Sequence, residues 1–184
     1  MTDRVIAFLV RERARLAGAL VRRRVTLGFF AAAAALAMAR PTWLTWSAGL
    51  AVASVGEALR IWAAGHLEKG REVTRSGPYR WTRHPLYVGS GIIALGVVIA
   101  SRSAIVALIG IMYIGVTIPM AIRSEEAFLQ RRFGPTYDLY RRDEAPPMVR
   151  RFSLAHARRN REYRAVAGLI GGFAILAARL LLSI

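Results

Sequence analysis

Arginine, histidine and proline stand close together in residues 75–90 (RSGPYRWTRHPLYVGS), immediately before an apolar run. The Gly-Pro pair at 77–78 is typical of a turn, whereas Pro85 suits the first position of a helix and favours an extended His84 before it. Arg83 and His84 would then stand at a helix N-terminus, where free amide groups and the positive end of the dipole favour an anion. This pattern predicts a site for a carboxylate or phosphate. The alternative is that the arginines only anchor the chain beside a membrane and the histidine caps the helix.

A second group of polar residues follows the next apolar run, in residues 120–142 (MAIRSEEAFLQRRFGPTYDLYRR). Glu125 and Glu126 are adjacent acids in a chain that contains only 11 acidic residues. On a continuing helix, Glu126 could pair with Arg123 in a solvated salt bridge. The second possibility is that one glutamate receives the cationic group of a ligand whose anionic end lies at the first site. A ligand with a carboxylate, an ammonium and a sulfonium would suit both groups, provided that they are close in space.

Five apolar segments must position these residues. At about 1.5 Å per residue, the first and third would span only about 22 Å, which is short for a bilayer core of about 30 Å. The connections at 40–42 and 101–103 are brief enough for tight turns only, so the first four segments form two helical hairpins. The sequence therefore predicts an all-α integral membrane protein of one domain, with about five transmembrane helices. The five segments are 25–39, 43–64, 86–100, 104–122 and 165–183.

Basic residues are concentrated between the apolar segments and give the chain a net charge of +16. Of its 27 Lys and Arg residues, 23 lie in residues 1–24, 65–86 and 122–164, which share one face if the hairpins form. The positive-inside rule then places this face and the N-terminus in the cytoplasm, where they would also attract anionic headgroups. Because topology accounts for most of the positive charge, no nucleic-acid partner is expected.

The single domain divides into four parts along the chain. Residues 1–24 interleave apolar residues with arginines and predict a basic amphipathic helix on the cytoplasmic leaflet, the alternative being a disordered basic tail. Residues 25–122 hold the four hairpin segments, and 123–164 form a polar, cytoplasmic helical region. Residues 165–183 form a last transmembrane or interfacial helix.

Two further observations concern the kinds of site that the chain could hold. It has no cysteine, and its three histidines are not in a metal-ligand spacing, so no metal site is expected. Arg60 lies within an apolar segment, with Glu57 one turn before it. An ionisable pair at membrane depth is a functional candidate, although Arg60 is near the cytoplasmic end and could extend its side chain to water.

The two polar groups together resemble a known superfamily. GPYRWTRHPLYVG (77–89), followed after an apolar run by EEAFLQRRFGPTYDLY (125–140), is similar to the isoprenylcysteine carboxyl methyltransferases and phospholipid methyltransferases, which are integral membrane enzymes. The shared pattern is G-x-Y-x-x-x-R-H-P-x-Y-x-G, then E-E and F-G-x-x-Y-x-x-Y. EALRIWAAGHL (57–67) also resembles the segment that precedes this pattern. The likeness covers roughly residues 45–142, and the chain departs from the superfamily after that by continuing to another apolar segment.

The resemblance implies that S-adenosylmethionine binds in a cytoplasmic cleft and that a lipid-like acceptor enters sideways from the bilayer. One set of residues would line the amino-acid end of the cofactor, with the glycine allowing close approach, and three tyrosines would form the wall around the adenosine. Glu125 or Glu126 would face the cofactor or the incoming nucleophile, and with Arg83 these are the expected catalytic residues. The first set is Arg83, His84, Tyr87 and Gly89, the tyrosines are Tyr79, Tyr137 and Tyr140, and Arg60 is expected near the cofactor.

Three functions therefore compete. The first is S-adenosylmethionine-dependent methyl transfer to a lipid-like or small apolar acceptor, either a carboxylate or an amine. This reaction is an in-line displacement that needs no metal, and an amine would need a base such as Glu126 to take its proton. The second is an NADPH-dependent reductase of the membrane sterol type, which has a similar R-H-P motif. The third is a non-catalytic membrane protein whose arginines only set its topology.

Overall fold

The structure, a computed structural model, describes residues 26–182, and within that range it is all-helical with no β-strand. The predicted fold class is therefore confirmed as all-α. The amphipathic helix expected at 1–24 lies outside the described residues, as does residue 183. In chain order the elements are the helix Thr26–Met38, α2 (Trp43–His66), the 3-10 helix η1 (Gly77–Arg80), α3 (Pro85–Ser101), α4 (Ala104–Phe133), α5 (Pro135–Arg141), α6 (Leu154–Arg159) and α7 (Tyr163–Leu182).

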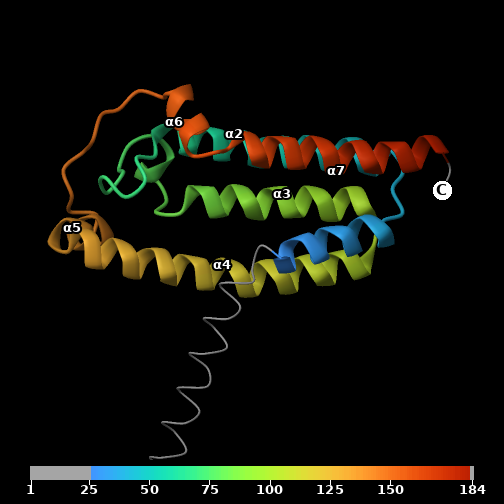
Figure 1. The fold of residues 1–184 in the computed structure, drawn as a ribbon, viewed down its shortest axis with the longest axis horizontal. Helices are drawn as coiled ribbons and strands as arrows, with labels where there is room; N and C mark the ends of the chain where they lie inside the picture. The colour runs from blue at the N-terminus through green and yellow to red at the C-terminus, as the bar shows by residue number, and fades with distance from the viewer. Residues whose placement is uncertain (1–25, 183–184) are drawn as a thin grey trace, which may run out of the picture.

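The long helices lie side by side, and the polar connections gather at one end of them (Figure 1). α3 lies between α2 and α4, and α7 runs along α2. The segment that joins α2 to α3 lies at the same end of the molecule as α5 and α6, whereas the two short turns lie at the other end. This arrangement places the two polar groups of the sequence at a common end of the helices.

The two short turns are confirmed, and local interactions explain where they fall. Thr42 caps α2 through a reciprocal pair of hydrogen bonds with Thr45, which satisfies free amide groups of the first turn. Arg102 adopts a left-handed conformation (φ 48°) that ends α3, and the Ser103 side chain accepts a hydrogen bond at the start of α4. The backbone amide of Arg40 donates to the carbonyl of Ser101 over 2.7 Å, so the two turns are bonded to each other.

α4 is longer than the apolar segment predicted at 104–122. It continues without interruption to Phe133, a length of 30 residues or about 45 Å. Because a bilayer core is only about 30 Å thick, one end of such a helix must project beyond it. The helix ends where Gly134 takes a positive φ of 45°, and Pro135 then begins α5. The F-G-P part of the motif is therefore a sharp change of direction that returns the chain toward η1.

Small residues allow α2 and α3 to pack unusually closely. A methyl group added at Gly56 would lie 2.7 Å from the backbone oxygen of Gly89, and one added at Gly96 would lie 2.6 Å from the backbone nitrogen of Ala53. Such distances are shorter than any real contact of this kind, so these glycines are required for the approach of the two backbones. Small residues at helix–helix contacts are typical of membrane proteins. The closest packing in the fold thus joins the second and third predicted segments, across the border between the two predicted hairpins.

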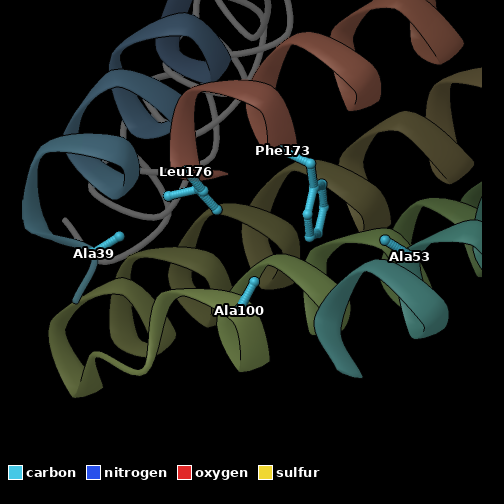
Figure 2. Packing of buried hydrophobic residues seen from close by; sticks show 5 residues of the cluster. All are labelled: Ala39, Ala53, Ala100, Phe173 and Leu176. Atoms are coloured by element: carbon cyan, nitrogen blue, oxygen red, sulfur yellow. The ribbon is translucent and has the colours of Figure 1, made fainter. Parts of the chain in front are cut away.

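A small apolar cluster closes the end of the molecule near the turns. It contains Ala39, Ala53, Ala100, Phe173 and Leu176, which come from four parts of the chain (Figure 2). The indole nitrogen of Trp46 donates to the carbonyl of Phe173 over 2.9 Å and attaches α7 to α2. α7 is also attached to the first helix, because the Arg179 guanidinium donates to the carbonyls of Leu36 and Ala37, which have no partner within that helix.

Two helices, α4 and α7, are long and apolar enough to cross a membrane by length and composition. Only 11% of the most apolar window of each is buried inside the molecule, so most of their apolar side chains face outward. Thr26–Met38 and α3 are apolar but shorter. The total of about five transmembrane helices remains a prediction.

Candidate active site

The two polar groups of the sequence meet where α3 begins. The Nε2 atom of His84 lies 3.1 Å from the Oε1 atom of Glu126, although the residues are 42 positions apart. Glu126 therefore pairs with His84. The alternative from the sequence, a salt bridge between Glu126 and Arg123, is not the pairing that the structure shows. The two polar groups are therefore close in space, as a single ligand that contacts both of them would require. Both side chains remain accessible in part, since 14% of His84 and 34% of Glu126 is exposed.

The three tyrosines form a buried wall on one side of this pair. The Tyr140 hydroxyl donates to the backbone carbonyl of Tyr79 over 2.8 Å, and Tyr137 packs beside Tyr140 with ring centres 6.3 Å apart. Burial raises the pKa of Tyr140 to about 12. The pKa of Tyr79 is raised mainly by burial and, to a smaller extent, by the negative charge of Glu125. The pKa of Tyr137 is raised in the same way by burial and by the negative charge of Glu126. All three hydroxyls are therefore protonated at neutral pH, and both glutamates lie near them.

The tyrosines also have a packing role that the sequence did not reveal. Tyr137 is 2% exposed and Tyr140 is 8% exposed, and both belong to an apolar cluster with Val73. Their predicted contact with adenosine stays a prediction. Arg83 is exposed on the same side, where its positive charge offsets part of the increase that burial causes in the pKa of Tyr137 and Tyr140.

Arg60 lies at the centre of a second, buried polar cluster. Its Nη2 atom is 2.6 Å from Glu162 and its Nε atom is 3.8 Å from Glu57, while Nη1 donates to the Ser90 hydroxyl and to the carbonyl of Leu86. The two glutamates are only 5% and 6% exposed. Arg60 thus contacts the first two turns of α3, directly after the His84–Glu126 pair. The expectation that Arg60 lies near a cofactor stays a prediction.

Gly89 faces α2 rather than open space. A methyl group added to it would lie 2.6 Å from Cγ of Arg60 and 2.7 Å from the backbone oxygen of Gly56. The absence of a side chain at this position is therefore needed by the neighbouring helix and by Arg60. Close approach of a cofactor to Gly89 was the sequence-based expectation, and it stays untested. Tyr87, two residues earlier, has its ring 5.9 Å from that of His84.

Glu162 is the functional candidate that sequence reasoning missed. It lies beyond the part of the chain that resembles the methyltransferases, just before α7. A signal was nevertheless present, because Glu162 is the one acid that follows Glu144 in a strongly basic segment. Its charge also contributes, after burial and the charges of Glu125 and Tyr140, to the raised pKa of Tyr79. Glu162 is therefore a member of the Arg60 cluster whose charge also acts on Tyr79.

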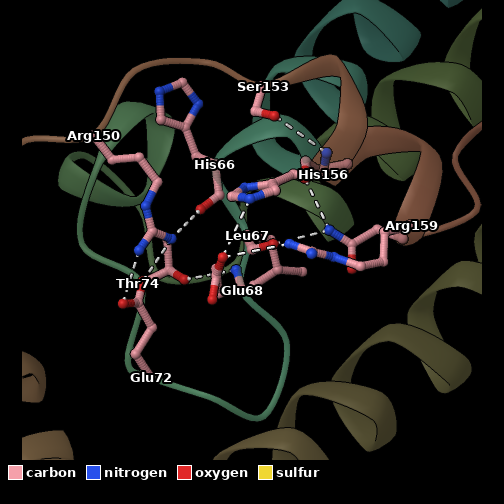
Figure 3. A network of polar contacts seen from close by, with 11 residues as sticks. His66, Leu67, Glu68, Glu72, Thr74, Arg150, Ser153, His156 and Arg159 are labelled. Atoms are coloured by element: carbon pink, nitrogen blue, oxygen red, sulfur yellow. Dashed lines mark hydrogen bonds and ion pairs between the residues drawn. The ribbon is translucent and has the colours of Figure 1, made fainter.

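A network of polar contacts attaches the segment that precedes Glu162 to the end of α2 (Figure 3). Arg150 pairs with Glu72 over 2.7 Å and donates to the carbonyl of His66 over 3.2 Å. Glu68 receives both His156, at 3.2 Å, and Arg159, at 3.3 Å. The side-chain amide of Asn160 donates to the carbonyls of Ala64 and Leu67, which are left free by the end of the helix. The segment that follows the superfamily pattern thus contributes Glu162, the partner of Arg60, to the candidate site.

The start of α3 fits the charged ends of S-adenosylmethionine. The helix has no side-chain cap hydrogen bond, and the Nδ1 atom of His84 is buried without a hydrogen-bond partner among the described residues. These groups suit a carboxylate. Glu125 and Glu126 are partly exposed nearby and suit an ammonium or sulfonium. Within residues 26–182, no group of three or more histidine, aspartate or glutamate side chains could hold a metal ion.

An apolar cavity of about 540 Å³ lies beyond Arg60, between the helices. Thr26–Met38, α3, α4 and α7 form its walls, and Glu57, Arg60 and Ser90 form its polar end. Its volume is within the range of about 300–1,000 Å³ that is usual for small-molecule sites. The Arg60 cluster therefore borders the cavity and also contacts the first two turns of α3, directly after His84.

The fold and these contacts agree with a family match. Residues 29–136, which are more than half of the chain, match the family model described as phospholipid methyltransferase. The chain belongs to this family, which is part of the superfamily of integral membrane methyltransferases related to the isoprenylcysteine carboxyl methyltransferases. With the outward-facing apolar helices α4 and α7, family membership indicates a membrane-associated protein.

Curated relatives carry names of a different kind. The chain is 40% identical over 113 residues to the nickel-cobalt-cadmium resistance protein NccN of Alcaligenes xylosoxydans xylosoxydans, and 36% identical over 110 residues to the cobalt-zinc-cadmium resistance protein CzcN of Cupriavidus metallidurans. Each match covers 58% of this chain and 48% of the relative, so the chain spans about half the length of the curated relatives it matches. No solved structure matches the chain.

Proposed function

We propose that this protein transfers a methyl group from S-adenosylmethionine to a lipid-like or small apolar acceptor at the cytoplasmic face of a membrane. The observation that carries the proposal is the His84–Glu126 contact, because it joins the two motif halves into one site with a place for an anion beside a place for a cation. Family membership supports the same reaction. It favours methyl transfer over the reductase and over a non-catalytic role.

Different residues would bind the two charged ends of the cofactor. S-adenosylmethionine, when bound, supplies a methyl group activated by a sulfonium. The start of α3, with Arg83 and His84, would hold its carboxylate, and Glu125 or Glu126 would hold its positive end or receive a proton from the acceptor. Arg60, with Glu162 paired to it, would form the border between this site and the cavity. The contribution of the protein is then to position the acceptor about 3–3.5 Å from the methyl carbon.

A binding titration of the purified protein in detergent micelles tests the proposal. S-adenosylmethionine should bind and NADPH should not. Because a hydrogen bond to a charged group is worth about 1.5–3 kcal/mol, Glu126→Gln should weaken cofactor binding at least about tenfold. Glu144→Gln removes the same charge from an exposed position on the polar segment and should leave binding unchanged. A wild-type protein that binds no S-adenosylmethionine would refute the proposal.

The cytoplasmic placement is supported by the positive-inside distribution of the basic residues. The chain has no cysteine, so a single Glu144→Cys substitution gives a unique reactive thiol. In intact cells, a thiol reagent that does not cross membranes should leave this cysteine unlabelled. Labelling before the cells are opened would reverse the proposed orientation.

A further inference from the structure

The cavity beyond Arg60 is kept open by small residues on two helices. Gly168 and Gly172 of α7 line it, and a methyl group added to either would meet no atom within 4 Å. These glycines therefore differ from those between α2 and α3, which permit close packing. Alanines of the helix Thr26–Met38 also line it. Most of the residues that line the cavity are apolar, so the cavity suits a hydrocarbon group.

The polar end of the cavity carries an acid that receives no hydrogen bond from the described residues. Glu57 is 95% buried, and neither of its carboxylate oxygens receives a hydrogen bond from the described residues. The cation paired with it is Arg60, through Nε at 3.8 Å, which is too long for a hydrogen bond. A buried carboxylate without a hydrogen-bond donor is unfavourable, so a ligand that brings a donor would satisfy it.

The same end has no spare cation for an anionic ligand. Arg60 is the one basic residue among those that line the cavity, and its guanidinium already contacts Glu162, Ser90 and the carbonyl of Leu86. The cluster contains two acids, Glu57 and Glu162, and one base, Arg60. A carboxylate or a phosphate would therefore meet repulsion here, whereas an ammonium would meet an unpaired acceptor.

We propose that this cavity is the acceptor site, and that it takes a compact or single-tailed apolar amine whose nitrogen binds Glu57. The proposal rests on the methyltransferase function proposed above and makes it more specific. It disfavours a carboxylate acceptor, because Glu57 would repel it. It also disfavours a two-chain phospholipid, because the residues that line the cavity offer no free basic group for the phosphate. An ammonium group supplies N–H donors for the carboxylate oxygens of Glu57 and a positive charge close to them.

The reaction balances with no further reagent. The ammonium first releases a proton to a carboxylate or to water, and the neutral nitrogen then gives its lone pair to the methyl carbon. The bond between that carbon and sulfur breaks with its electron pair remaining on sulfur, which becomes a neutral thioether. The methylated nitrogen is left positively charged and loses its proton on leaving.

The experiment compares acceptors that share a tail and differ in the head. The purified full-length protein is incubated with labelled S-adenosylmethionine and with dodecylamine, dodecanol or dodecanoic acid, and separately with vesicles of dioleoyl phosphatidylethanolamine. We expect dodecylamine to be methylated at least tenfold faster than each of the others. We also expect dodecylamine alone to raise the unfolding temperature of the protein without the cofactor. Faster methylation of the alcohol, the acid or the vesicle lipid overturns the proposal.

Two variants identify the site. Glu57→Gln keeps the shape of the side chain and should abolish the preference for dodecylamine and its effect on the unfolding temperature. Gly172→Leu should fill the cavity and block methylation, whereas Gly171→Leu, at an exposed neighbouring glycine that does not line the cavity, should not. If the two leucine variants behave alike, the cavity is not the acceptor site.

A titration with S-adenosylmethionine in the same samples separates the two proposals. If the wild-type protein and both leucine variants bind the cofactor, and dodecylamine neither reacts nor stabilises the protein, the acceptor proposal fails and the methyltransferase proposal stands. If the cofactor does not bind to the wild-type protein, the methyltransferase proposal fails and the acceptor proposal fails with it.

Discussion

The close packing of α2 on α3 gives the most direct test of the fold that supports the site. Gly96→Ala would place a methyl group 2.6 Å from both the backbone nitrogen of Ala53 and the backbone oxygen of Gly49. Neither atom can move without the helix that carries it. Gly91→Ala lies in the same helix and would meet no atom within 4 Å. The two substitutions are therefore chemically identical and differ in one respect, the space available.

The magnitude follows from this pairing. Exchange of Gly for Ala inside a helix stabilises it by about 0.5–1 kcal/mol, and this gain is common to both variants. Their difference is then the overpacking at Gly96, which costs about 1–3 kcal/mol. For a chain of this size, each kcal/mol shifts the midpoint of unfolding by roughly 2–4 °C. We expect Gly96→Ala to unfold roughly 2–12 °C below Gly91→Ala when both are heated in the same detergent and followed by circular dichroism.

A third variant connects this packing to the site. Gly89→Ala would meet a backbone oxygen, as Gly96→Ala does, and in addition Cγ of Arg60 at 2.6 Å. It should therefore destabilise the protein similarly and also displace the Arg60 side chain from Glu162. At a temperature where both variants are folded, we expect Gly89→Ala to lower methyl transfer more than Gly96→Ala. Equal stability of Gly96→Ala and Gly91→Ala would refute the close approach of α2 and α3, and with it this explanation.

Two further predictions concern the polar end. Tyr140→Phe removes the hydrogen bond to Tyr79, so the free energy of unfolding should fall by about 1 kcal/mol at neutral pH. The folded-state pKa of Tyr140 is raised from 10.0 to about 12. The contribution of protonated Tyr140 to stability should therefore be fully present below about pH 10 and be lost as the pH rises to about 12. In denaturant titrations over this range, the free energy of unfolding should fall less in the variant than in the wild-type protein. Arg150→Met removes the partly exposed ion pair with Glu72, so amide hydrogen exchange in residues 143–153 should accelerate by up to about fivefold, whereas Arg151→Met should leave it unchanged. Unchanged exchange in Arg150→Met would contradict the attachment of this segment to α2.

Local signals in the sequence were sufficient for the apolar helices and for most of their ends. Pro85 after His84 predicted the start of α3, and the turn at Arg102 lies where three polar residues interrupt two apolar runs. The same signals failed at the end of α4, because apolarity marks where a membrane ends and not where a helix ends. Residues 123–133 favour helix by their composition, and the helix stops only at Gly134, where the backbone takes a positive φ.

The candidate site was predictable as far as its two motif halves. His84 and Glu126 were expected to be close, and they are in contact. The alternative pairing of Glu126 with Arg123 was equally allowed by helix geometry, and no local rule could have chosen between them. Glu162 was missed for a related reason, since its partner Arg60 lies about a hundred positions earlier. Such pairs are decided by which helices lie side by side.

Taken alone, the sequence determines the helical segments, the tight turns between them, the concentration of positive charge in three segments and the two motif halves, because capping residues, hydropathy and charge act over a few positions. The tertiary structure decides what the small residues do. Glycines between α2 and α3 bring two backbones into contact, whereas Gly168 and Gly172 leave a cavity open. The two kinds of glycine cannot be told apart by composition. Their difference arises from whether another helix is present on that face, and this is a property of the folded chain.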